Sequence, residues 1–418
     1  MSAVMSESSF MPAVARFKEW LIYSLVFLFP IAGVSVRHWF SGIFSVLVLM
    51  SLWDLVKKWG KRPALFKEEK IWLWLCAVFF MSFLVSSLWN GWGHAQNRAL
   101  GVDIRYLLVV PLFLMLRQYP AAWRFLLAGI LFAAPVLVVQ AYYDTAVLKL
   151  PRAQGPYSPN LLGPVAALVV VWLLSSWRLW GKYRWVIPLL VCAALWAVVM
   201  SGSRGGYLGL LVMLFFWCVF YIKGCWRVSM LVVVLSLPVA AYNMFPSVEQ
   251  RVDSTVVEMD EYVKKLMEGE RKADGSVNVR LEMWRAGWMV FNDAPILGVG
   301  PSNYTESVKK YIGQDNLPKA VADHSQAHSM YIDILMSRGV VGFVIFMGML
   351  WYPFYYFITT RNISPETAIF GILQIFGFAV FSITDAAPFC KGNFVSIYLL
   401  CMTIFLSKHV VEVKRRLE

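Results

Sequence analysis

Charged residues are scarce in this sequence: only 15% of its 418 residues are Asp, Glu, Lys or Arg, whereas 59% are apolar. A soluble domain contains about 25% charged and about 45–50% apolar residues. A water-soluble fold could not bury this much apolar surface. The same figures exclude a disordered or collagen-like chain and a nucleic-acid-binding protein, despite the net charge of +13. We therefore expect an integral membrane protein with many spans.

Patterns that hold metals, cofactors or nucleotides are also missing. The six cysteines have no paired spacing, which predicts inert thiols rather than disulfides or a metal site. There is no Walker-type phosphate loop, no Gly-x-Ser-x-Gly elbow and no His-Glu-x-x-His motif. His324 and His328 are four residues apart, but no third metal ligand is evident. We expect an active site without a metal or a cofactor.

Long apolar runs are abundant. At about 20 residues per membrane-spanning helix, they predict an all-α protein with twelve spans, of which the fourth is short because Arg105 and Arg117 bound it. The predicted spans are 20–36, 39–56, 71–90, 105–117, 122–143, 160–177, 184–200, 205–222, 227–245, 339–358, 366–386 and 390–407.

Basic residues orient these spans. Lys and Arg collect on cytoplasmic loops. With an even number of spans and both termini in the cytoplasm, every basic run falls on the cytoplasmic side. The runs are Lys57, Lys58, Lys61, Arg62, Lys67 and Lys70; Arg178, Lys182 and Arg184; Lys223 and Arg227; and Lys408, Lys414, Arg415 and Arg416.

One long stretch breaks the membrane pattern and divides the chain into spans one to nine (1–245), an outer loop (246–328), and spans ten to twelve with a short tail (329–418). The loop holds 13 acidic and 10 basic residues, so its net charge is −3 and that of the remainder is +16. We expect two helices in it, within 256–272 and 280–292. The second places Leu281, Trp284, Trp288 and Phe291 on one apolar stripe. We interpret the loop as an amphipathic cap on the outer leaflet, with a solvated connector as the alternative.

Several cations fall on the outer side, where few are expected. Ser201–Gly206 forms a glycine-rich turn around Ser203 and Arg204 that is suited to an anion. The alternative for Arg204 is a side chain that extends to the lipid headgroups. Arg280 and Arg285 in the loop, and Arg152 and Asn160 in another outer segment, are individually compatible with surface roles. Together they favour an anionic substrate, such as a lipid-linked pyrophosphate.

His328 lies at the end of the loop, where an imidazole can accept a proton near neutral pH. A helix-start histidine bonded to the backbone is the alternative. The residues around it carry a pattern: His328-Ser329, nine residues, then Gly339-Val340-Val341-Gly342. This pattern resembles that of the O-antigen ligases, within a wider group of O-antigen polymerases and oligosaccharyltransferases. The Ser-Arg-Gly turn and Arg280 also resemble the family, and Arg152 with Gly163 matches a looser element of the polymerases.

The resemblance implies a GT-C-like architecture in the bacterial inner membrane and an inverting, metal-independent glycosyl transfer at the periplasmic face. The donor would be O-antigen on undecaprenyl pyrophosphate, and the acceptor a sugar hydroxyl of lipid A–core. Arg204 and Arg280 would stabilise the leaving pyrophosphate, and His328 would accept the proton of the acceptor. Asp385 would orient His328 or contact sugar. An O-antigen polymerase and a protein O-oligosaccharyltransferase are the near alternatives, and a transporter is the distant one.

Overall fold

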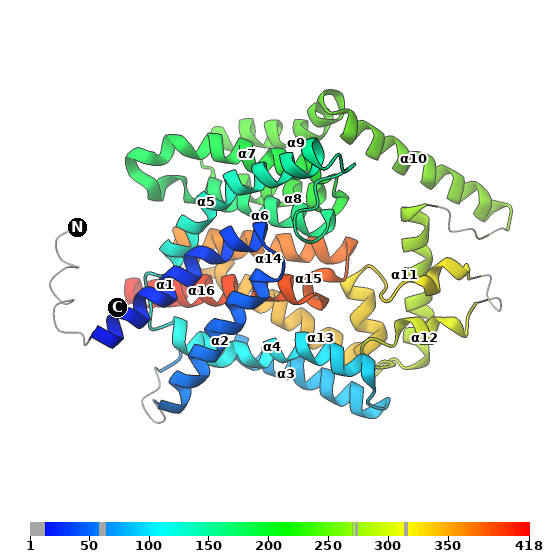
Figure 1. The fold of residues 1–418 in the computed structure, drawn as a ribbon, viewed down its shortest axis with the longest axis horizontal. Helices are drawn as coiled ribbons and strands as arrows, with labels where there is room; N and C mark the ends of the chain where they lie inside the picture. Colours follow the sequence, from blue (N-terminus) through cyan, green and yellow to red (C-terminus); the bar gives the residue numbers. More distant parts are fainter. Residues whose placement is uncertain (1–12, 58–63, 270, 272–274, 313–316) are drawn as a thin grey trace.

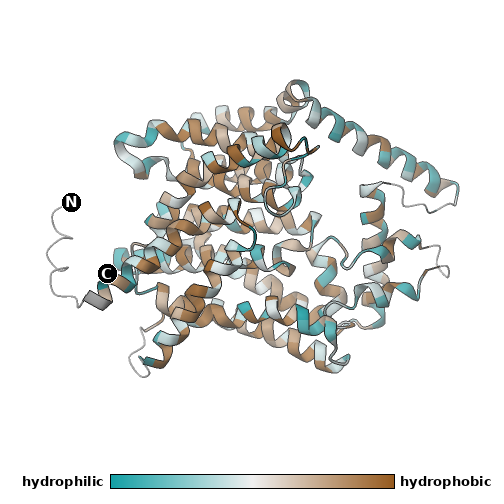
Figure 2. Ribbon diagram, viewed as in Figure 1, coloured by the Kyte–Doolittle hydropathy of each residue, from teal (hydrophilic) through white to brown (hydrophobic). Residues whose placement is uncertain are grey.

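The computed structural model describes residues 13–57, 64–269, 271, 275–312 and 317–418. Lys58, Lys61, Arg62 and Lys272 of the sequence-based interpretation lie outside these residues. The described chain is helical and contains no strand, which confirms the all-α prediction (Figure 1). Apolar residues cover the helical bundle, whereas hydrophilic residues gather on α10–α12 at one end (Figure 2).

The helices of the bundle correspond to the predicted spans. They are α1 (Ala13–Ser35), α2 (Trp39–Lys57), α3 (Lys67–Trp89), α4 (His94–Leu116), α5 (Ala122–Tyr142), α6 (Pro159–Ser176), α7 (Ile187–Ser201), α8 (Arg204–Tyr221), α9 (Trp226–Met244), α13 (Met330–Thr360), α14 (Pro365–Thr384) and α16 (Gly392–Leu417).

Eleven helical segments of the described chain are long and apolar enough to cross a membrane. One of them, Pro159–Ser201, covers 43 residues. It contains α6 and α7, which are joined by the 3₁₀ turn Trp177–Val186 with a break at Gly181, where φ is 51°. When this segment is divided at the break, each of the twelve predicted spans has its helix.

The fourth span is longer than the sequence predicts, because α4 begins at His94 rather than near residue 105. Hydropathy gave a short span because Asp103 and Arg105 interrupt the apolar run. In the fold, Asp103 pairs with Arg338 of α13, and Arg105 donates a hydrogen bond to Ser396 of α16 at 3.3 Å. Arg338 thus compensates the charge of Asp103, and Ser396 accepts a hydrogen bond from Arg105, although both partners are distant in sequence.

The tenth span is broken at Gly339, where φ is 63°. The part after the break coincides with the predicted span 339–358. The part before it packs against α11 (Ser276–Asp293) and α12 (Tyr304–Lys309). A Cβ on Gly339 would lie 2.2 Å from the carbonyl oxygen of Ile296. Glycine is therefore required here both by the left-handed conformation and by the close approach of the 295–298 segment.

The bundle is built around α14 and α16, of which 83% and 89% of the span residues are buried. The periphery includes α9, of which only 6% is buried within the protein. A helix that is apolar on all sides and exposed along its length is stable when lipid surrounds it. The burial pattern therefore agrees with a bundle embedded in a membrane.

The segment between α9 and α13 contains α10 (Pro246–Met267), α11 (Ser276–Asp293) and α12 (Tyr304–Lys309), followed by the 3₁₀ turn Lys319–Asp323. Helices α11 and α12 and the 3₁₀ turn share a small hydrophobic core that includes Met283, Val290, Tyr304 and Val308. The predicted apolar stripe of α11 is not the face that enters this core, since Trp288 is 52% exposed. Its role in a cap on the outer leaflet stays a prediction. Periodicity selected the largest side chains, but the close contact of Gly287 with Ile332 of α13 turns a face of smaller residues inward.

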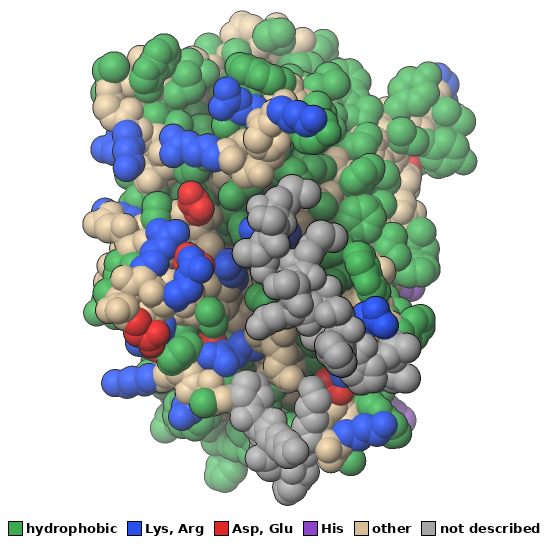
Figure 3. Space-filling view, turned by 90° about the vertical axis from the view of Figure 1, so that its left-hand side faces the viewer, with side chains coloured by type: hydrophobic (Ala, Val, Ile, Leu, Met, Phe, Trp, Pro, Cys, Tyr) green, Lys and Arg blue, Asp and Glu red, His purple; other side chains and the backbone are tan. Residues whose placement is uncertain are grey.

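The two ends of the bundle differ in charge. The end of α16 lies opposite α10–α12 in Figure 1. Viewed from the α16 end, the protein presents many Lys and Arg side chains and few acidic ones (Figure 3). By the charge rule for cytoplasmic loops, this difference supports an orientation with α10–α12 on the outer side.

Candidate functional site

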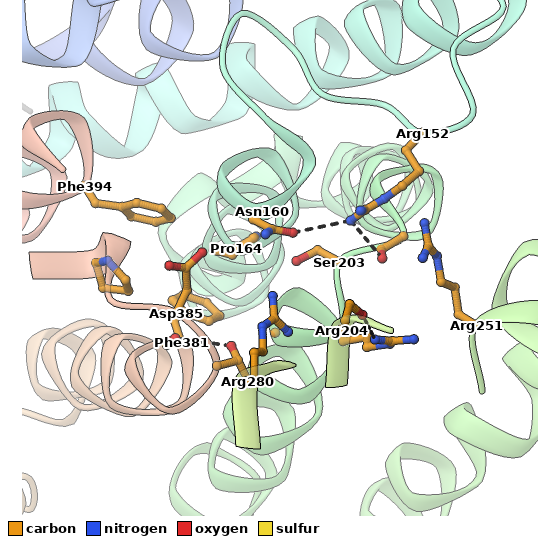
Figure 4. Close-up of a pocket in the computed structure, with 15 residues that line it drawn as sticks. Arg152, Asn160, Pro164, Ser203, Arg204, Arg251, Arg280, Phe381, Asp385 and Phe394 are labelled. Carbon is orange, nitrogen blue, oxygen red and sulfur yellow. Dashed lines mark hydrogen bonds between the residues drawn. The ribbon is translucent and has the colours of Figure 1, made fainter. Parts of the chain in front are cut away.

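A cavity of about 270 Å³ lies where α10 and α11 meet the outer ends of the bundle helices (Figure 4). Its walls come from seven helices and three connecting segments that are distant in sequence. The lining residues are Arg152, Asn160, Pro164, Gly202, Ser203, Arg204, Gly205, Arg251, Ser276, Arg280, Phe381, Thr384, Asp385, Pro388 and Phe394. Six of the eight residues that the sequence singled out are among them: Arg152, Asn160, Ser203, Arg204, Arg280 and Asp385.

The Ser-Arg-Gly turn forms the start of α8. The preceding helix α7 ends at Ser201, and Gly202 adopts a left-handed conformation with φ of 56°. Ser203 then caps α8, with its Oγ accepting a hydrogen bond from the Gly206 amide at 3.2 Å. Because the first amides of a helix have no partner within it, the N-terminus of α8 offers N–H groups and a positive dipole to an anion in the cavity.

Arg152 is held by the end of α7. Its Nε donates to the carbonyl oxygen of Ser201 at 2.8 Å, and its Nη2 donates to that of Gly202 at 3.0 Å. Burial, together with the nearby positive charge of Arg251, lowers the pKa of Arg152 to about 10. The guanidinium therefore stays charged at neutral pH, with most of its donors already used.

Arg204 links the bundle to the outer helices. Its Nη1 donates to Ser276 Oγ of α11 at 2.8 Å, and its Nη2 donates to Ser254 Oγ of α10 at 3.3 Å. Glu258 of α10 lies 3.8 Å from the same Nη2. The side chain thus lines the cavity and also holds the start of α11 and the middle of α10 against α8.

Arg280 and Arg251 have uncommitted guanidinium groups. Neither side chain makes a hydrogen bond or ion pair with another residue that the structure describes, and both line the cavity (Figure 4). Arg251 was not singled out from the sequence, because it is one of many charged residues on an amphipathic helix. Its position three residues before Ser254, on the side of α10 that faces Arg204, is evident only from the fold.

His328 stands beside the cavity, next to Asp385. Its Nδ1 lies 3.4 Å from Asp385 Oδ1, close enough for an ion pair although the geometry is not that of a hydrogen bond. The backbone of His328 is left-handed, with φ of 48°. This conformation is uncommon for a residue with a side chain and is often found at functional sites.

Asp385 connects His328 to the cavity. Its Oδ1 accepts a hydrogen bond from the Ala387 amide at 3.1 Å and one from Gln326 Nε2 at 3.4 Å. Burial alone would raise the pKa of Asp385. The interactions with His328, the Ala387 amide and the charge of Arg280 outweigh burial, so the pKa is lower than usual. An ionised carboxylate therefore faces both the histidine and the cavity.

Arg285 lies outside this arrangement. Its guanidinium is 3.2 Å from Glu282 Oε2, one turn back on α11, and it does not line the cavity. His324 packs edge-on against His328, with ring centroids 5.4 Å apart. Burial, followed by the proximity of His328, lowers the pKa of His324. Among the described residues, no three His, Cys, Asp or Glu side chains are grouped so that they could hold a metal ion.

The central part of the chain is similar to a known protein family. The sequence profile described as "O-antigen ligase" matches residues 189–347. Residues 189–347 are thus similar to the O-antigen ligases. A relative, an uncharacterized protein of Haemophilus influenzae, is 23% identical over 330 residues, which cover 75% of this chain and 80% of the relative.

The O-antigen ligase match contains much of the site. Ser203, Arg204, Arg251, Arg280 and His328 all lie within residues 189–347. The remaining cavity residues, among them Arg152, Asn160 and Asp385, come from outside the matched segment and are brought to it by the fold.

Proposed function

We propose that the protein transfers O-antigen polysaccharide from undecaprenyl pyrophosphate to a sugar hydroxyl of lipid A–core, at the periplasmic face of the inner membrane. One observation carries the proposal: a cavity lined by four arginines and one aspartate lies next to a histidine, at the end of the bundle where α10 and α11 meet it. The family match supports the same class of reaction.

The charge of the cavity favours a pyrophosphate. Arg152, Arg204, Arg251 and Arg280 carry four positive charges, and Asp385 carries one negative charge. The N-terminus of α8 adds unpaired amides on the same side. A pyrophosphate diester has two negative charges, and guanidinium groups and helix N-termini bind phosphate well. Both substrates are membrane lipids, so a site at the level where the spans end is accessible to each of them.

The reaction requires one proton transfer and one displacement. His328 accepts the proton of the acceptor hydroxyl as its oxygen forms a bond with the anomeric carbon of the donor sugar. The bond from that carbon to the phosphate oxygen breaks on the opposite face, so the configuration inverts. The electron pair stays on the leaving undecaprenyl pyrophosphate, where the arginines stabilise it. Asp385 keeps the imidazole oriented and stabilises its positive charge.

The test is reconstitution with purified full-length protein, undecaprenyl-pyrophosphate-linked glycan and lipid A–core, with EDTA present. We expect a shifted lipopolysaccharide ladder from the wild type. Because a positioned base contributes about 10²–10⁴-fold to a rate, His328→Ala should reduce the ladder by at least that factor while thermal unfolding stays unchanged. Undiminished transfer by this variant would remove His328 from the mechanism.

The same assay separates the alternatives. If the donor is consumed to give longer lipid-linked glycan, the protein is a polymerase. If glycan is transferred to a protein acceptor instead, it is a protein O-oligosaccharyltransferase. If neither lipid is consumed and a lipid-linked glycan moves across the vesicle membrane, the protein is a transporter. Loss of the ladder in EDTA and its recovery with a divalent cation would contradict metal independence.

A further inference from the structure

Resting on the proposed function, we propose that Arg251 binds the phosphate of the donor that carries the lipid, so that the outer helix α10 supplies half of the pyrophosphate site. The inference starts from position: Arg251 lines the cavity from α10, opposite the bundle residues that close it (Figure 4). Its guanidinium has no hydrogen bond or ion pair with any other described residue, although the cavity is rich in polar groups.

The space next to Arg251 is open for a ligand because of Gly202. A Cβ on this glycine would lie 3.1 Å from Arg152 Nε and 3.6 Å from Arg251 Nε. The two arginines therefore approach each other across a position that has no side chain. Among the described residues, no acidic side chain lines that end of the cavity, so both positive charges face the same unfilled space. Two close like charges repel, and an anion between them removes the repulsion.

The repulsion also affects the protonation of Arg152. Burial is the largest cause of its lowered pKa of about 10, and the charge of Arg251 is the second. A bound phosphate would reverse the second effect. Arg251 itself is kept in place from behind: Ser254 Oγ donates to the Arg251 carbonyl oxygen at 3.2 Å, and Arg204 Nη2 donates to Ser254 Oγ at 3.3 Å.

The two ends of the cavity then have different roles. Asp385 and the neighbouring His328 mark the end where the sugar reacts, and Arg280 lies between Asp385 and Arg204 in the view of Figure 4. The phosphate attached to the sugar lies next to Arg280 in this arrangement. The second phosphate lies farther from Asp385, at the end with Arg152, Arg251 and Gly202. The donor is thus bound in one direction along the cavity.

The experiment measures binding of short-chain analogues to the full-length protein in detergent. Farnesyl pyrophosphate has both phosphates, and farnesyl monophosphate has one. We expect Arg251→Ala to weaken binding of the pyrophosphate roughly 10- to 100-fold, the range for a lost charged hydrogen bond. Binding of the monophosphate, which can stay at the Arg280 end, should change about three-fold or less, and Arg251→Lys should restore part of the loss.

Lys264→Ala is the matched control, because Lys264 is on the same helix with a 68% exposed side chain and pairs only with Asp260, one turn away, among the interactions of the described residues. It should leave both affinities unchanged. Thermal unfolding of each variant reports whether α10 stays folded. The inference is overturned if Arg251→Ala binds the pyrophosphate as the wild type does, or if both ligands weaken equally.

A parallel transfer assay separates this inference from the proposed function. If the wild type makes lipopolysaccharide and Arg251→Ala has an unchanged KM for the donor, the inference fails and the function stands. If pyrophosphate binding depends on Arg251 but no lipid acceptor is glycosylated, the phosphate site stands and the proposed transfer fails.

Discussion

The cavity has a membrane side and an outer side, and each contributes two arginines that are used differently. On the membrane side, Arg152 donates hydrogen bonds to the carbonyl oxygens at the end of α7. Arg204, on the same side, donates hydrogen bonds to serines of α10 and α11. Arg251 and Arg280, on the outer side, have no such partners among the described residues. The arginines of the membrane side therefore hold the site together, and those of the outer helices have guanidinium groups that are free to bind a ligand.

This difference changes the interpretation of the loop between α9 and α13. The sequence suggested a cap or a connector that contains Arg280 and ends at His328. In the structure Arg251, Ser276 and Arg280 of this loop line the cavity. The site is complete only when α10 and α11 are in place. Helix α11 packs on α13 and helix α10 packs on α9, and Arg204 of α8 adds hydrogen bonds to both α10 and α11. Variants on the two sides should therefore fail in different ways.

The largest effect in this comparison is expected at Arg280. Arg280→Ala removes a free guanidinium that faces the leaving group, and loss of one such donor costs about 10²–10³-fold in kcat. Arg280→Lys keeps the charge but loses the planar fork, so a partial loss is expected. The measurement is the rate of glycan transfer in the reconstituted assay, with thermal unfolding as the check on folding.

Arg285→Ala is the control for Arg280, since Arg285 is five residues away on α11 and pairs with Glu282 instead of lining the cavity. Glu282 keeps Tyr262 and Arg271 as partners. We expect wild-type transfer by this variant and a small loss of stability. Equal damage by both substitutions would mean that α11 responds to any lost charge, and Arg280 would lose its specific role.

Arg204→Ala should have an intermediate effect that combines activity with docking. The substitution removes hydrogen bonds to Ser254 and Ser276, each worth about 1 kcal/mol or somewhat more with a charged donor. We expect transfer to fall roughly 10- to 100-fold, by the usual conversion of 1.4 kcal/mol per factor of ten, and α10 to become easier to cleave by protease. Limited proteolysis measures the second change.

A double variant, Ser254→Ala with Ser276→Ala, tests how Arg204 acts. If docking is its main role, the double variant should reproduce both the lost activity and the faster cleavage of Arg204→Ala. If the double variant transfers glycan normally while Arg204→Ala does not, Arg204 acts as a ligand of the substrate, and the division between the two sides of the cavity is wrong.

The sequence predicted the helices of the bundle well, because each apolar run of span length has no stable alternative to a helix in lipid. It located the start of the fourth span incorrectly, since no hydropathy window can detect that Arg338 compensates Asp103 from a distance of 235 residues. The apolar stripe of α11 was evident from the sequence, but not whether this stripe faces the core of the loop or its surroundings. Large apolar side chains are ambiguous at a membrane surface, where they are as stable outside as inside.

The sequence predicts those parts of the site that are formed by continuous motifs. The turn at Ser203 and Arg204, and the glycine pattern after His328, are continuous motifs whose geometry the chain sets by itself. Arg251 could not be found in this way, because only its place in the cavity, which the fold determines, distinguishes it from the other charged residues of α10. Arg285 had the same local signal as Arg280, but its side chain lies on the Glu282 side of α11.

The smallest expected effect concerns Asp385, the only acidic residue among those described that line the cavity. Its pKa is lowered because its contacts and nearby charges favour the ionised form despite burial. A carboxylate with a lowered folded pKa stabilises the fold above the pKa of the unfolded chain, about 3.9. That contribution is lost as the pH falls through the folded pKa. The contribution of the Asp385 carboxylate to the free energy of unfolding is therefore constant above about pH 4.

Asp385→Asn isolates this contribution. We expect the wild type to be more stable than the variant by about 1 kcal/mol between pH 5 and 8, and the difference to shrink below pH 4. Thermal unfolding in detergent at a series of pH values gives the comparison. Because the wild-type carboxylate stays ionised from pH 5 to 8, its orienting effect on His328 should also be constant there. A stability difference that grows as the pH falls would mean that Asp385 is destabilised as an ion, and that the arginines of the outer side do not reach it.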